Sequence, residues 1–404
     1  MHVLYFHQHF STPAGSTGIR SYKMAKKLIE YGHTVTVVCG SYKGANTGLV
    51  HSFKNNVREG NVDGIHVVEF NLAYANQDSF LKRTAIFLRF ACLSMKYALS
   101  AKYDLIFATS TPLTIALPGL VGKWFRRKPF IFEVRDLWPE LPREMGVITN
   151  PIILKLMGLM EWMAYKSADA LIALSPGIQN GILRFRKDEK RVTIIPNGSD
   201  IDLFAGSHKS VRPKGVEEHH LMAIFAGTHG IANGLQSIIN SAKILKERQC
   251  DDVRFVLIGQ GKLKDRLIQQ ANELELDNII FLDPVDKEQL SQLLACADIG
   301  MQILANVPAF YDGTSPNKFF DYIAAGLPVL INYPGWLAEK ISNTGCGVVV
   351  EPDNAEAFCD ALINLAKNRQ QLSQMGQSAL MLAKSQFDRD LLSKNFVRWL
   401  ERWA

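Results

Sequence analysis

The sequence has no long uninterrupted hydrophobic run: no apolar stretch in its 404 residues reaches the roughly 18 residues that a helix needs to cross a bilayer. The N-terminus, MHVLYFHQHF, also lacks the basic segment that opens a secretory signal peptide, and it is typical of a first β-strand. We therefore expect neither a transmembrane helix nor a signal peptide.

Cysteine is sparse and shows no pattern. None of the six cysteines has the spacing of a zinc site, and they lie far apart at Cys39, Cys92, Cys250, Cys296, Cys346 and Cys359. Scattered thiols are typical of proteins in a reducing compartment, so the sequence favours a cytoplasmic protein without disulfides.

Several catalytic motifs are missing as well. The sequence contains no P-loop, no G-x-S-x-G motif, no ordered Ser-His-Asp arrangement and no internal repeat. Asp200-Ile201-Asp202 has the form of a metal-binding D-x-D motif, but it falls in a predicted linker. The sequence therefore predicts no metal site.

What the sequence does contain is an ordinary globular composition with unevenly distributed charge. Hydrophobic residues make up 47% and charged residues 21%, and the length favours two domains of about 200 residues each. Residues 1–200 hold 25 Lys/Arg against 15 Asp/Glu, whereas the remainder holds 20 against 24. A basic N-terminal half indicates an anionic partner there: nucleic acid, a membrane surface or a phosphorylated acceptor.

Short apolar strands alternate with amphipathic helices through both halves, which predicts an α/β protein with two doubly wound parallel sheets. We expect a first domain at residues 1–198, a second at 199–385, and a C-terminal helix at 386–404 that packs back on the first domain. The turn-rich residues 195–200 open the predicted linker. Residues 40–63 are expected to form a polar excursion between strands.

The stretch GTSPNKFFDYIAAGLPV, residues 313–329, predicts a phosphate-facing helix. Ser315 is expected to cap this helix and Pro316 to be its first residue. Lys318 then lies in the first turn and Asp321 one turn further on. Free backbone N–H groups and the helix dipole favour a phosphate, and a carboxylate nearby can hold a ribose diol, so the stretch indicates a pocket for a nucleotide diphosphate. The alternative is an ordinary capped helix with both side chains in solvent.

Glycine-containing turns follow three other predicted strands. In the first half, Gly15 and Gly18 allow close approach of the backbone to a ligand, and Arg20 can point at a phosphate. Parallel strands carry their ligand sites at their carboxyl ends, so the second-half turns are expected to converge on one crevice. These turns contain Gly227, Thr228, His229, Gly230, Gly259, Gly261 and Lys262.

The segment FEVRDLWPE, residues 132–140, also follows a predicted strand and carries several polar side chains. We expect Arg135, Asp136 and Glu140 to contact a polar acceptor and Trp138 to stack on a sugar ring. The alternative is a salt-bridged loop.

Basic and large apolar residues interleave in predicted helices at residues 80–103 and 151–165, and again at 124–128. Such segments can lie in a membrane interface, although core helices of a large domain have a similar composition. Because all three fall in the basic half, we expect this half to contact the cytoplasmic face of the plasma membrane.

Together these motifs resemble the nucleotide-sugar glycosyltransferases of family 4, which have the GT-B fold. The resemblance covers nearly the whole chain and rests on HQHFSTPAGSTGIR, EVRDLWPE, VTIIPNGSDIDLF, FAGTHG, VLIGQGK, ADIGMQI and SPNKFFDYIAAGLPV. RDLWPE together with GTSPNKFFDY is similar to the bacterial O-antigen and capsule enzymes, most of all to L-fucosamine (N-acetyl-L-fucosaminyl) transferases.

The resemblance implies two Rossmann-like domains facing a cleft, the first for the acceptor and the second for the donor. It implies retaining, metal-independent transfer from a UDP-sugar to a polyprenyl-diphosphate-linked saccharide, with no cofactor and no nucleic acid. Closure about the linker at residues 196–204 is expected to bring the substrates together.

The resemblance also implies roles for individual positions. Asp321 matches a glutamate that holds the ribose hydroxyls, Asp136 lies where many relatives have a histidine beside the reacting sugar, and Lys318 is expected to stabilise the departing diphosphate. The other donor-facing positions that the resemblance implies are Gly15, Gly18, Gly227, Thr228, Gly230, Gly259, Gly261, Thr314, Ser315, Pro316 and Asn317.

The chain departs from the family pattern at two places. Gly313, with Asp312 beside it, stands where many relatives have a first glutamate. Thr228, His229 and Asn233 stand where many have an arginine and a lysine. Lys318, Arg20 or Lys262 is then expected to supply the positive charge, and the shape around Asp136, His229 and Asp312 to select the sugar.

Two other functions fit the same fold. A UDP-sugar 2-epimerase would need no lipid acceptor and would leave the basic apolar helices unexplained. A non-catalytic nucleotide-sugar-binding partner of a membrane assembly would fit the missing first glutamate.

Overall fold

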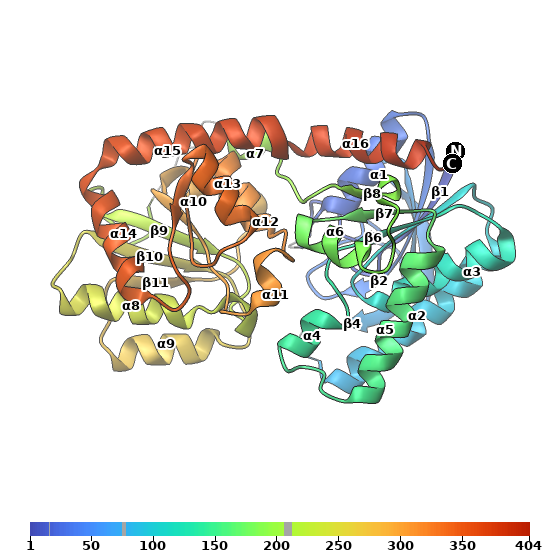
Figure 1. Cartoon of the computed structure of the whole chain (residues 1–404), viewed down its shortest axis with the longest axis horizontal. Coiled ribbons are helices and arrows are strands. Elements are labelled where there is room, and N and C mark those ends of the chain that lie inside the picture. The colour runs from blue at the N-terminus through green and yellow to red at the C-terminus, as the bar shows by residue number, and fades with distance from the viewer. Residues whose placement is uncertain (16, 75–77, 206–211) are drawn as a thin grey trace. The chain divides into compact units, whose positions relative to one another are not determined.

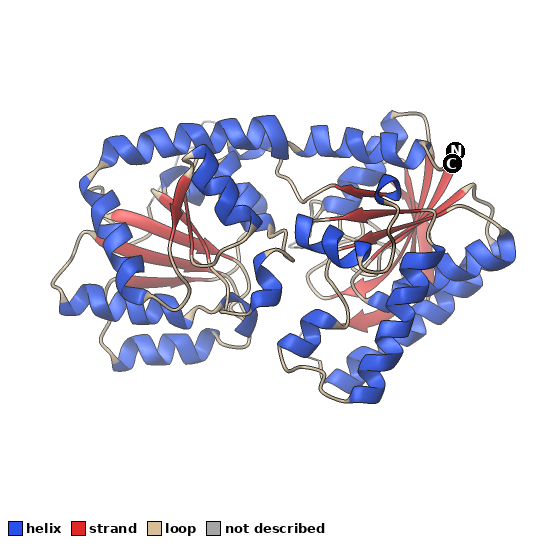
Figure 2. Cartoon of the chain, viewed as in Figure 1, coloured by secondary structure: helices blue, strands red, loops and turns tan. Residues whose placement is uncertain are grey.

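The computed structural model of this protein describes residues 1–15, 17–74, 78–205 and 212–404. Its contacts divide the chain into two units. The first comprises Met1–Pro196, Gly313–Ser315 and Asp390–Ala404, and the second comprises Asn197–Asp312 and Pro316–Arg389. In each unit the strands lie at the centre with helices around them (Figures 1 and 2).

In the described part of the first unit, eight strands form one sheet in the order β3-β4-β2-β1-β5-β6-β7-β8. All neighbouring strands run parallel except β3 and β4, which are antiparallel. The strands are β1 (His2–Phe6), β2 (Thr34–Tyr42), β3 (Val57–Val62), β4 (Ile65–Tyr74), β5 (Leu105–Thr109), β6 (Phe130–Val134), β7 (Ala170–Ala173) and β8 (Val192–Ile194).

The helices of this unit come from both ends of the chain. They are α1 (Arg20–Glu30), α2 (Phe80–Ser100), α3 (Ala116–Arg126), α4 (Glu140–Glu144), α5 (Pro151–Ser167), α6 (Pro176–Leu183) and, from the C-terminus, α16 (Arg389–Glu401). Two short 3₁₀ turns lie at Leu113–Ile115 and Glu189–Arg191.

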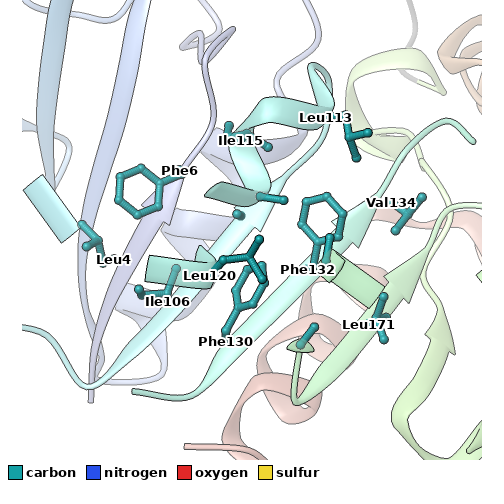
Figure 3. Packing of buried hydrophobic residues seen from close by; sticks show 14 of the residues in the cluster. Leu4, Phe6, Ile106, Leu113, Ile115, Leu120, Phe130, Phe132, Val134 and Leu171 are labelled. Atoms are coloured by element: carbon teal, nitrogen blue, oxygen red, sulfur yellow. The ribbon is translucent and has the colours of Figure 1, made fainter. Parts of the chain in front are cut away.

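The period-2 geometry of the strands divides the core of the first unit into two layers. In β1, Leu4 and Phe6 join one cluster with Leu120 of α3 (Figure 3). Tyr165 of α5 belongs to the same cluster. The alternate residues of the same strands join a second cluster, which includes side chains of α1 and α16. Both faces of the sheet are therefore buried, which explains the near-continuous apolar runs in its strands.

The structure corrects the expectation for residues 40–63. Strand β2 continues to Tyr42, and Val57–Val62 forms the edge strand β3. The β3 sequence, VREGNV, alternates poorly between apolar and polar residues, and no residue of β3 is fully buried. A polar edge strand of this kind avoids pairing with other chains, but it gives little strand signal in the sequence.

In the described part of the second unit, six strands form a parallel sheet in the order β11-β10-β9-β12-β13-β14. They are β9 (Leu221–Ala226), β10 (Val253–Ile258), β11 (Ile279–Leu282), β12 (Ile299–Gln302), β13 (Val329–Ile331) and β14 (Gly347–Val349). The sequence-based prediction of two parallel α/β sheets is confirmed.

The helices of the second unit include one short 3₁₀ turn at Ile231–Asn233 and a π-helical turn at Ala383–Phe387. The α-helices are α7 (Ile201–Phe204), α8 (Gln236–Glu247), α9 (Lys264–Glu273), α10 (Lys287–Cys296), α11 (Pro308–Tyr311), α12 (Asn317–Ala324), α13 (Trp336–Thr344), α14 (Ala355–Lys367) and α15 (Arg369–Leu382). Among the described residues, no helix is both long and apolar enough to cross a membrane.

Candidate functional site

The second sheet reverses its winding at β9, which lies between β10 and β12. In open α/β sheets, ligands bind outside the carboxyl ends of the strands at such a switch point. The turn at residues 227–234 follows β9, and the turn at 259–263 follows β10. The glycine turns identified in the sequence therefore lie at the edge where a ligand is expected.

These two turns pack directly against each other. The His229 N–H donates to the Gln260 carbonyl at 3.1 Å, and the Leu263 N–H donates to the His229 carbonyl at 2.9 Å. A Cβ atom at Gly259 would lie 1.9 Å from the Gly227 carbonyl oxygen, and one at Gly261 would lie 2.5 Å from the His229 carbonyl oxygen. Contact between the turns is thus sufficient reason for glycine at both positions.

Lys318, in the first turn of α12, reaches the first of these turns, the one after β9. Its Nζ donates to Asn233 Oδ1 at 2.6 Å, and it lies 4.4 Å from the centre of the Phe225 ring. A Cβ atom at Gly227 would lie 3.2 Å from Lys318 Cε. Asn233 Nδ2 donates to the Thr228 carbonyl at 2.8 Å, so Asn233 links the lysine to the first turn.

The ammonium group of Lys318 has no carboxylate partner in the described part of the chain. Burial lowers the pKa of Lys318 to about 7. Burial also lowers the pKa of His229 to about 4, and the charge of Lys264 acts in the same direction, so the imidazole is neutral near pH 7. Lys318 is thus a partly buried cation, beside a neutral histidine, that an anionic ligand would stabilise.

The start of α12 differs by one residue from the sequence-based expectation. Pro316, not Ser315, occupies the N-cap, and Asn317 is the first helical residue. The Pro316 backbone is extended, with φ −74° and ψ 126°, and it makes no side-chain cap. The N–H groups of the first helical turn have no intrahelical acceptor, so the expected phosphate-binding feature remains at Asn317 and Lys318.

Asp321 is buried, with 3% of its surface exposed. One carboxylate oxygen accepts a hydrogen bond from Ser199 Oγ at 2.9 Å, and the other lies 2.5 Å from Lys287 Nζ. Both partners belong to the second unit. Lys287 was not recognised in the sequence, because no local pattern connects it to a residue 34 positions away.

Two other expected donor residues, Lys262 and Asp312, differ in their surroundings. Lys262 is exposed, whereas Lys264, which the sequence analysis missed, is buried. Lys264 Nζ donates to the Gly259 and Leu282 carbonyls at 2.9 and 3.0 Å and pairs with Asp283. Asp312 Oδ1 accepts the Trp336 N–H at 2.9 Å and so stabilises the start of α13.

In the first unit, the expected phosphate contact from Arg20 is wrong. Arg20 is 3% exposed, and its guanidinium forms an ion pair with Glu133 at 2.7 Å. It also donates to the Ile195 and Pro196 carbonyls at 2.8 and 2.6 Å. Burial alone would raise the pKa of Glu133, but the charge and hydrogen bonds of Arg20 lower it below its ordinary value. Arg20 therefore stabilises the end of the first unit instead of facing a ligand.

The two glycines before Arg20 differ in their surroundings. A Cβ atom at Gly15 would lie 2.2 Å from Ser11 Oγ and 2.7 Å from the Asn46 nitrogen, so close packing of the loop excludes a larger residue. Gly18 is exposed. Packing of the loop accounts for Gly15 without a ligand.

The residues after β6 lie beside the loop that follows β5. Thr111 Oγ1 donates to Asp136 Oδ2 at 2.9 Å, and Ser110 Oγ accepts the Arg135 N–H at 2.9 Å. Burial raises the pKa of Asp136, although the bond from Thr111 acts in the opposite direction. Arg135 Nη1 lies 3.4 Å from Nε2 of His7, a residue that the sequence analysis did not single out.

The other two expected acceptor residues make contacts of their own. Trp138 is partly buried and packs against the core of the first unit. Glu140 pairs with Arg184 at 2.6 Å. Ion pairing is the alternative function that the sequence left open for this segment, and an ion pair is present at Glu140.

Two family models match the chain, one in each half. The model described as Glycosyltransferase Family 4 matches residues 18–203, and the one described as Glycosyl transferases group 1 matches residues 208–380. The chain is also 25% identical over 244 residues to D-inositol 3-phosphate glycosyltransferase of Corynebacterium glutamicum. It is 24% identical over 216 residues to WcaI of Escherichia coli, a putative colanic acid biosynthesis glycosyl transferase. The first match covers 56% of this chain and 56% of the relative, and the second covers 51% of both. The chain therefore spans about half the length of these relatives.

Solved structures match along nearly the whole chain. Sucrose-phosphate synthase from Thermosynechococcus elongatus has a TM-score of 0.75 at 15% identity and covers 99% of this chain and 98% of its own. HepE of Anabaena, solved with UDP-glucose, has a TM-score of 0.69 at 17% identity, with full coverage of both chains. At these identities the likeness shows the fold alone, which is the GT-B fold.

Proposed function

Because the chain belongs to the glycosyltransferases of group 1 and family 4, we propose that it transfers a sugar from a UDP-sugar to a polyprenyl-diphosphate-linked saccharide. The second unit would hold the donor and the first unit the acceptor. The motif resemblance favours N-acetyl-L-fucosamine or a related amino or deoxy sugar, in O-antigen or capsule synthesis.

Lys318 is the observation that carries this proposal. It is a partly buried cation at the start of a helix, it has no carboxylate partner among the described residues, and it lies against the glycine turn that follows β9 at the switch point. A diphosphate would accept hydrogen bonds from Nζ and from the free N–H groups of Asn317 and Lys318. Relatives with the same fold include one solved with UDP-glucose, which supports a UDP-sugar as the donor.

In the proposed reaction, the bond between the sugar C1 atom and the diphosphate oxygen breaks, and a bond between C1 and the acceptor oxygen forms. The acceptor hydroxyl gives its proton to the departing diphosphate, whose new charge is stabilised by Lys318 and the helix N–H groups. These groups supply the positive charge, so the reaction that we propose needs no metal ion. Asp136 and Asp321 would contact the reacting sugar and the ribose, respectively.

The first test is thermal unfolding of the protein with UDP, other nucleoside diphosphates and UDP-sugars, in the presence of EDTA. A ligand that binds the native state alone stabilises it by about 2.7 kcal/mol at a concentration 100 times its Kd. We expect a selective rise in Tm with UDP. Absence of a shift with every nucleoside diphosphate would overturn the proposed donor site.

The second test is turnover with UDP-N-acetyl-L-fucosamine and a lipid-linked acceptor. Transfer to the lipid supports the proposed function. Epimerised UDP-sugar without transfer would identify a 2-epimerase instead, and UDP-sugar binding without either product would identify a non-catalytic binding partner.

We also propose that the first unit binds an anionic membrane surface through helix α5. The side of α5 away from the core carries Ile152, Leu156, Leu159 and Trp162, which are 70, 62, 51 and 46% exposed. Their spacing places them along one side of the helix. Exposed apolar side chains in such a stripe mark an interaction surface.

Charge around this stripe favours a lipid surface over a protein partner. Helices α2, α3 and α5 pack side by side on the first sheet (Figure 1). Exposed basic side chains occur on or beside all three helices: Lys82, Arg89, Lys96, Arg127, Lys155 and Lys166. Apolar side chains that enter the interface, surrounded by cations that attract anionic headgroups, are typical of peripheral membrane helices.

Co-sedimentation with vesicles of phosphatidylethanolamine and phosphatidylglycerol tests the membrane proposal. We expect Leu156→Glu/Trp162→Glu to reduce binding at least tenfold, since both changes place charge in the apolar stripe. Met381→Glu, at a methionine of the second unit that is 72% exposed, is the matched control. Equal binding by both variants, or binding of the native protein that is insensitive to salt and lipid charge, would contradict the proposal.

A further inference from the structure

Three neighbouring strands of the first sheet deliver polar side chains to one edge. His7 follows β1, Thr111 lies in the loop after β5, and Arg135 follows β6. Because these strands run parallel, their carboxyl ends meet at the same edge. This edge lies where the first sheet reverses its winding, between β1 and β5, so it is the ligand-binding position of this unit.

Arg135 at this edge forms no direct ion pair among the described residues, although its charge acts on Glu133 and Asp136 from a longer distance. A guanidinium has five N–H donors. Among the described residues, the side chain of Arg135 makes one polar contact, the 3.4 Å approach of Nη1 to His7 Nε2. No carboxylate forms an ion pair with it in the described ranges of the chain. A partly buried guanidinium without an anion is costly, because desolvation is not offset by pairing.

Arg20, a buried arginine of the same unit, differs from Arg135 because its guanidinium is fully paired. Its guanidinium is paired with Glu133 and with two backbone carbonyls. Glu133 comes just two positions before Arg135, yet its carboxylate is committed to Arg20 and to Thr109 Oγ1, which donates to it at 2.7 Å. The guanidinium of Arg20 is therefore fully paired, whereas that of Arg135 keeps N–H groups that can donate to a ligand.

His7 adds a second donor without an acceptor. An arginine can only donate, so the contact with Arg135 makes His7 Nε2 the acceptor and places the proton on Nδ1. His7 is 3% exposed, and Nδ1 has no hydrogen-bond partner in the part of the chain that the structure describes. Burial lowers the pKa of His7 well below its ordinary value, with Arg135 and His9 adding to the effect, which agrees with a neutral ring.

From this geometry we infer that Arg135 and Nδ1 of His7 form an anion-binding subsite in the first unit, which takes a phosphate group of the acceptor. Both groups are donors that lack an acceptor atom, and phosphate oxygens supply acceptors of the matching charge. The inference rests on the proposed transferase function and deepens it, because it assigns the acceptor an anionic group and adds His7 to the residues that bind it.

The neighbouring charges shape this subsite. Asp136 is the adjacent carboxyl group, and Thr111 holds one of its oxygens. His9 is a second imidazole, with its ring centre 6.4 Å from that of His7 and its pKa lowered to about 4 by burial and by Arg135 and Arg83. A bound phosphate would raise the pKa of both histidines, because its negative charge favours the protonated imidazole.

Titration calorimetry with inorganic pyrophosphate tests the subsite. The native protein is first saturated with UDP, so that the donor site is occupied and cannot take the probe. We expect one further site for pyrophosphate in the native protein and at least a tenfold loss of affinity in both Arg135→Gln and His7→Gln. The glutamine amide lies near the position of Nε2 and can still accept from Arg135, so its effect reports mainly the loss of a donor at the position of Nδ1.

Arg143→Gln is the matched control, because Arg143 is an exposed arginine of the same unit that pairs only with Glu144 among the described residues. It should bind pyrophosphate as the native protein does. Equal affinity in all variants, or no pyrophosphate site beside bound UDP, would overturn the inference. UDP binding is measured in each variant as well. If UDP binding is retained while the pyrophosphate result contradicts the subsite, only the subsite fails and the proposed donor site stands.

The same variants distinguish the source of the phosphate. In competition with pyrophosphate, farnesyl diphosphate represents a lipid-linked diphosphate, and glucose 6-phosphate represents a free sugar phosphate. Displacement by farnesyl diphosphate alone identifies the lipid-linked group, and displacement by the sugar phosphate alone identifies a soluble acceptor. Displacement by neither would contradict an acceptor phosphate at this position.

Discussion

At the scale of single residues, Lys318 connects the stability of the protein to its proposed function. Its pKa in the folded protein is about 7, below the ordinary value of 10.5. Between these two values the unfolded chain binds more protons than the folded one, so stability rises with pH across this interval. Below pH 7 the full cost of a buried charge is present. The group that would stabilise a diphosphate therefore destabilises the free protein.

Because the charge of Lys318 would favour diphosphate binding but lowers stability, Lys318→Met should change the two properties in opposite directions. At pH 6 the variant should have a higher free energy of unfolding than the native protein, because no charge is buried. Its affinity for UDP should fall roughly 10- to 100-fold, as expected for loss of a hydrogen bond to a charged group worth about 1.5–3 kcal/mol. Denaturant unfolding and calorimetry measure the two effects.

The pH dependence of UDP binding provides a second test of the role of Lys318, with the same Lys318→Met variant. The affinity of the native protein should decrease as the pH rises from 7 to 9, because free Lys318 loses its proton in this range, whereas that of Lys318→Met should change little. Lys262→Met, at an exposed lysine of the neighbouring turn, should behave like the native protein. A variant at position 318 with native affinity would exclude the lysine from the donor site.

Single residues also show why sequence patterns misassigned Arg20. The motif around it has an arginine at a glycine-containing helix start, which is a reasonable phosphate contact. Its partners are Glu133 and the carbonyls of Ile195 and Pro196, more than 100 positions away. No local pattern can reveal such partners, and the same is true of Lys287 beside Asp321.

At the scale of elements, the turns after β9 and β10 act as one structure. Their hydrogen bonds join residues 229, 260 and 263, and their glycines allow backbone to meet backbone. Lys264, at the start of α9, adds bonds from its ammonium group to the Gly259 carbonyl of the second turn and to the Leu282 carbonyl at the end of β11. The proposed donor site is therefore built on two turns that support each other, and we expect a change in one turn to displace the other.

Gly259→Ala tests this support. A Cβ atom there would lie 1.9 Å from the Gly227 carbonyl oxygen, and the φ angle of 145° disfavours any side chain. We expect a lower Tm together with weaker UDP binding, since the turn that carries Asn233 and contacts Lys318 must shift. Gly158→Ala is the control, because a Cβ atom at Gly158 of α5 meets nothing within 4 Å.

The control should be neutral or more stable by roughly 0.5–1 kcal/mol, the ordinary gain from replacing a helical glycine by alanine. Thermal unfolding of both variants with and without UDP gives the comparison. A Gly259→Ala protein with the native Tm and UDP affinity would show that the turns can separate without consequence, contrary to the packing described here.

At the scale of the whole molecule, the first unit is completed by the end of the chain. The sheet of this unit uses strands from the first half of the sequence, yet one of its two core layers includes Leu392, Phe396 and Leu400 of α16. Phe396 is fully buried, and its ring centre lies 4.9 Å from that of Phe107 in edge-to-face contact. The C-terminal helix is therefore part of the fold of the first unit.

Phe396→Ala should destabilise this unit by about 3–5 kcal/mol, the usual cost of removing a buried phenylalanine side chain. Leu391→Ala, at a leucine of the same helix that is 39% exposed, should cost far less. Denaturant unfolding followed by the fluorescence of tryptophans in both units measures the effect. Similar losses in the two variants would show that α16 contributes no buried core.

The sequence by itself determined the repeated strand–helix alternation, the two parallel sheets and the place of the glycine turns at strand ends. These features are encoded locally, because strands are buried on both faces and parallel strands need helical connections. Spacing also identified Lys318 near the start of a helix, where backbone N–H groups lack acceptors.

Only the tertiary structure decided which polar residues are paired. It committed Arg20 to Glu133, left Arg135 beside His7 without a carboxylate partner among the described residues, and placed Lys264 rather than Lys262 against the turns. It also revealed the polar edge strand β3 and showed which side chains of α16, the helix expected to pack back on the first domain, enter the first core. Ion pairs and core contacts join residues distant in sequence, and the energy of a buried charge depends on the partner that folding brings to it.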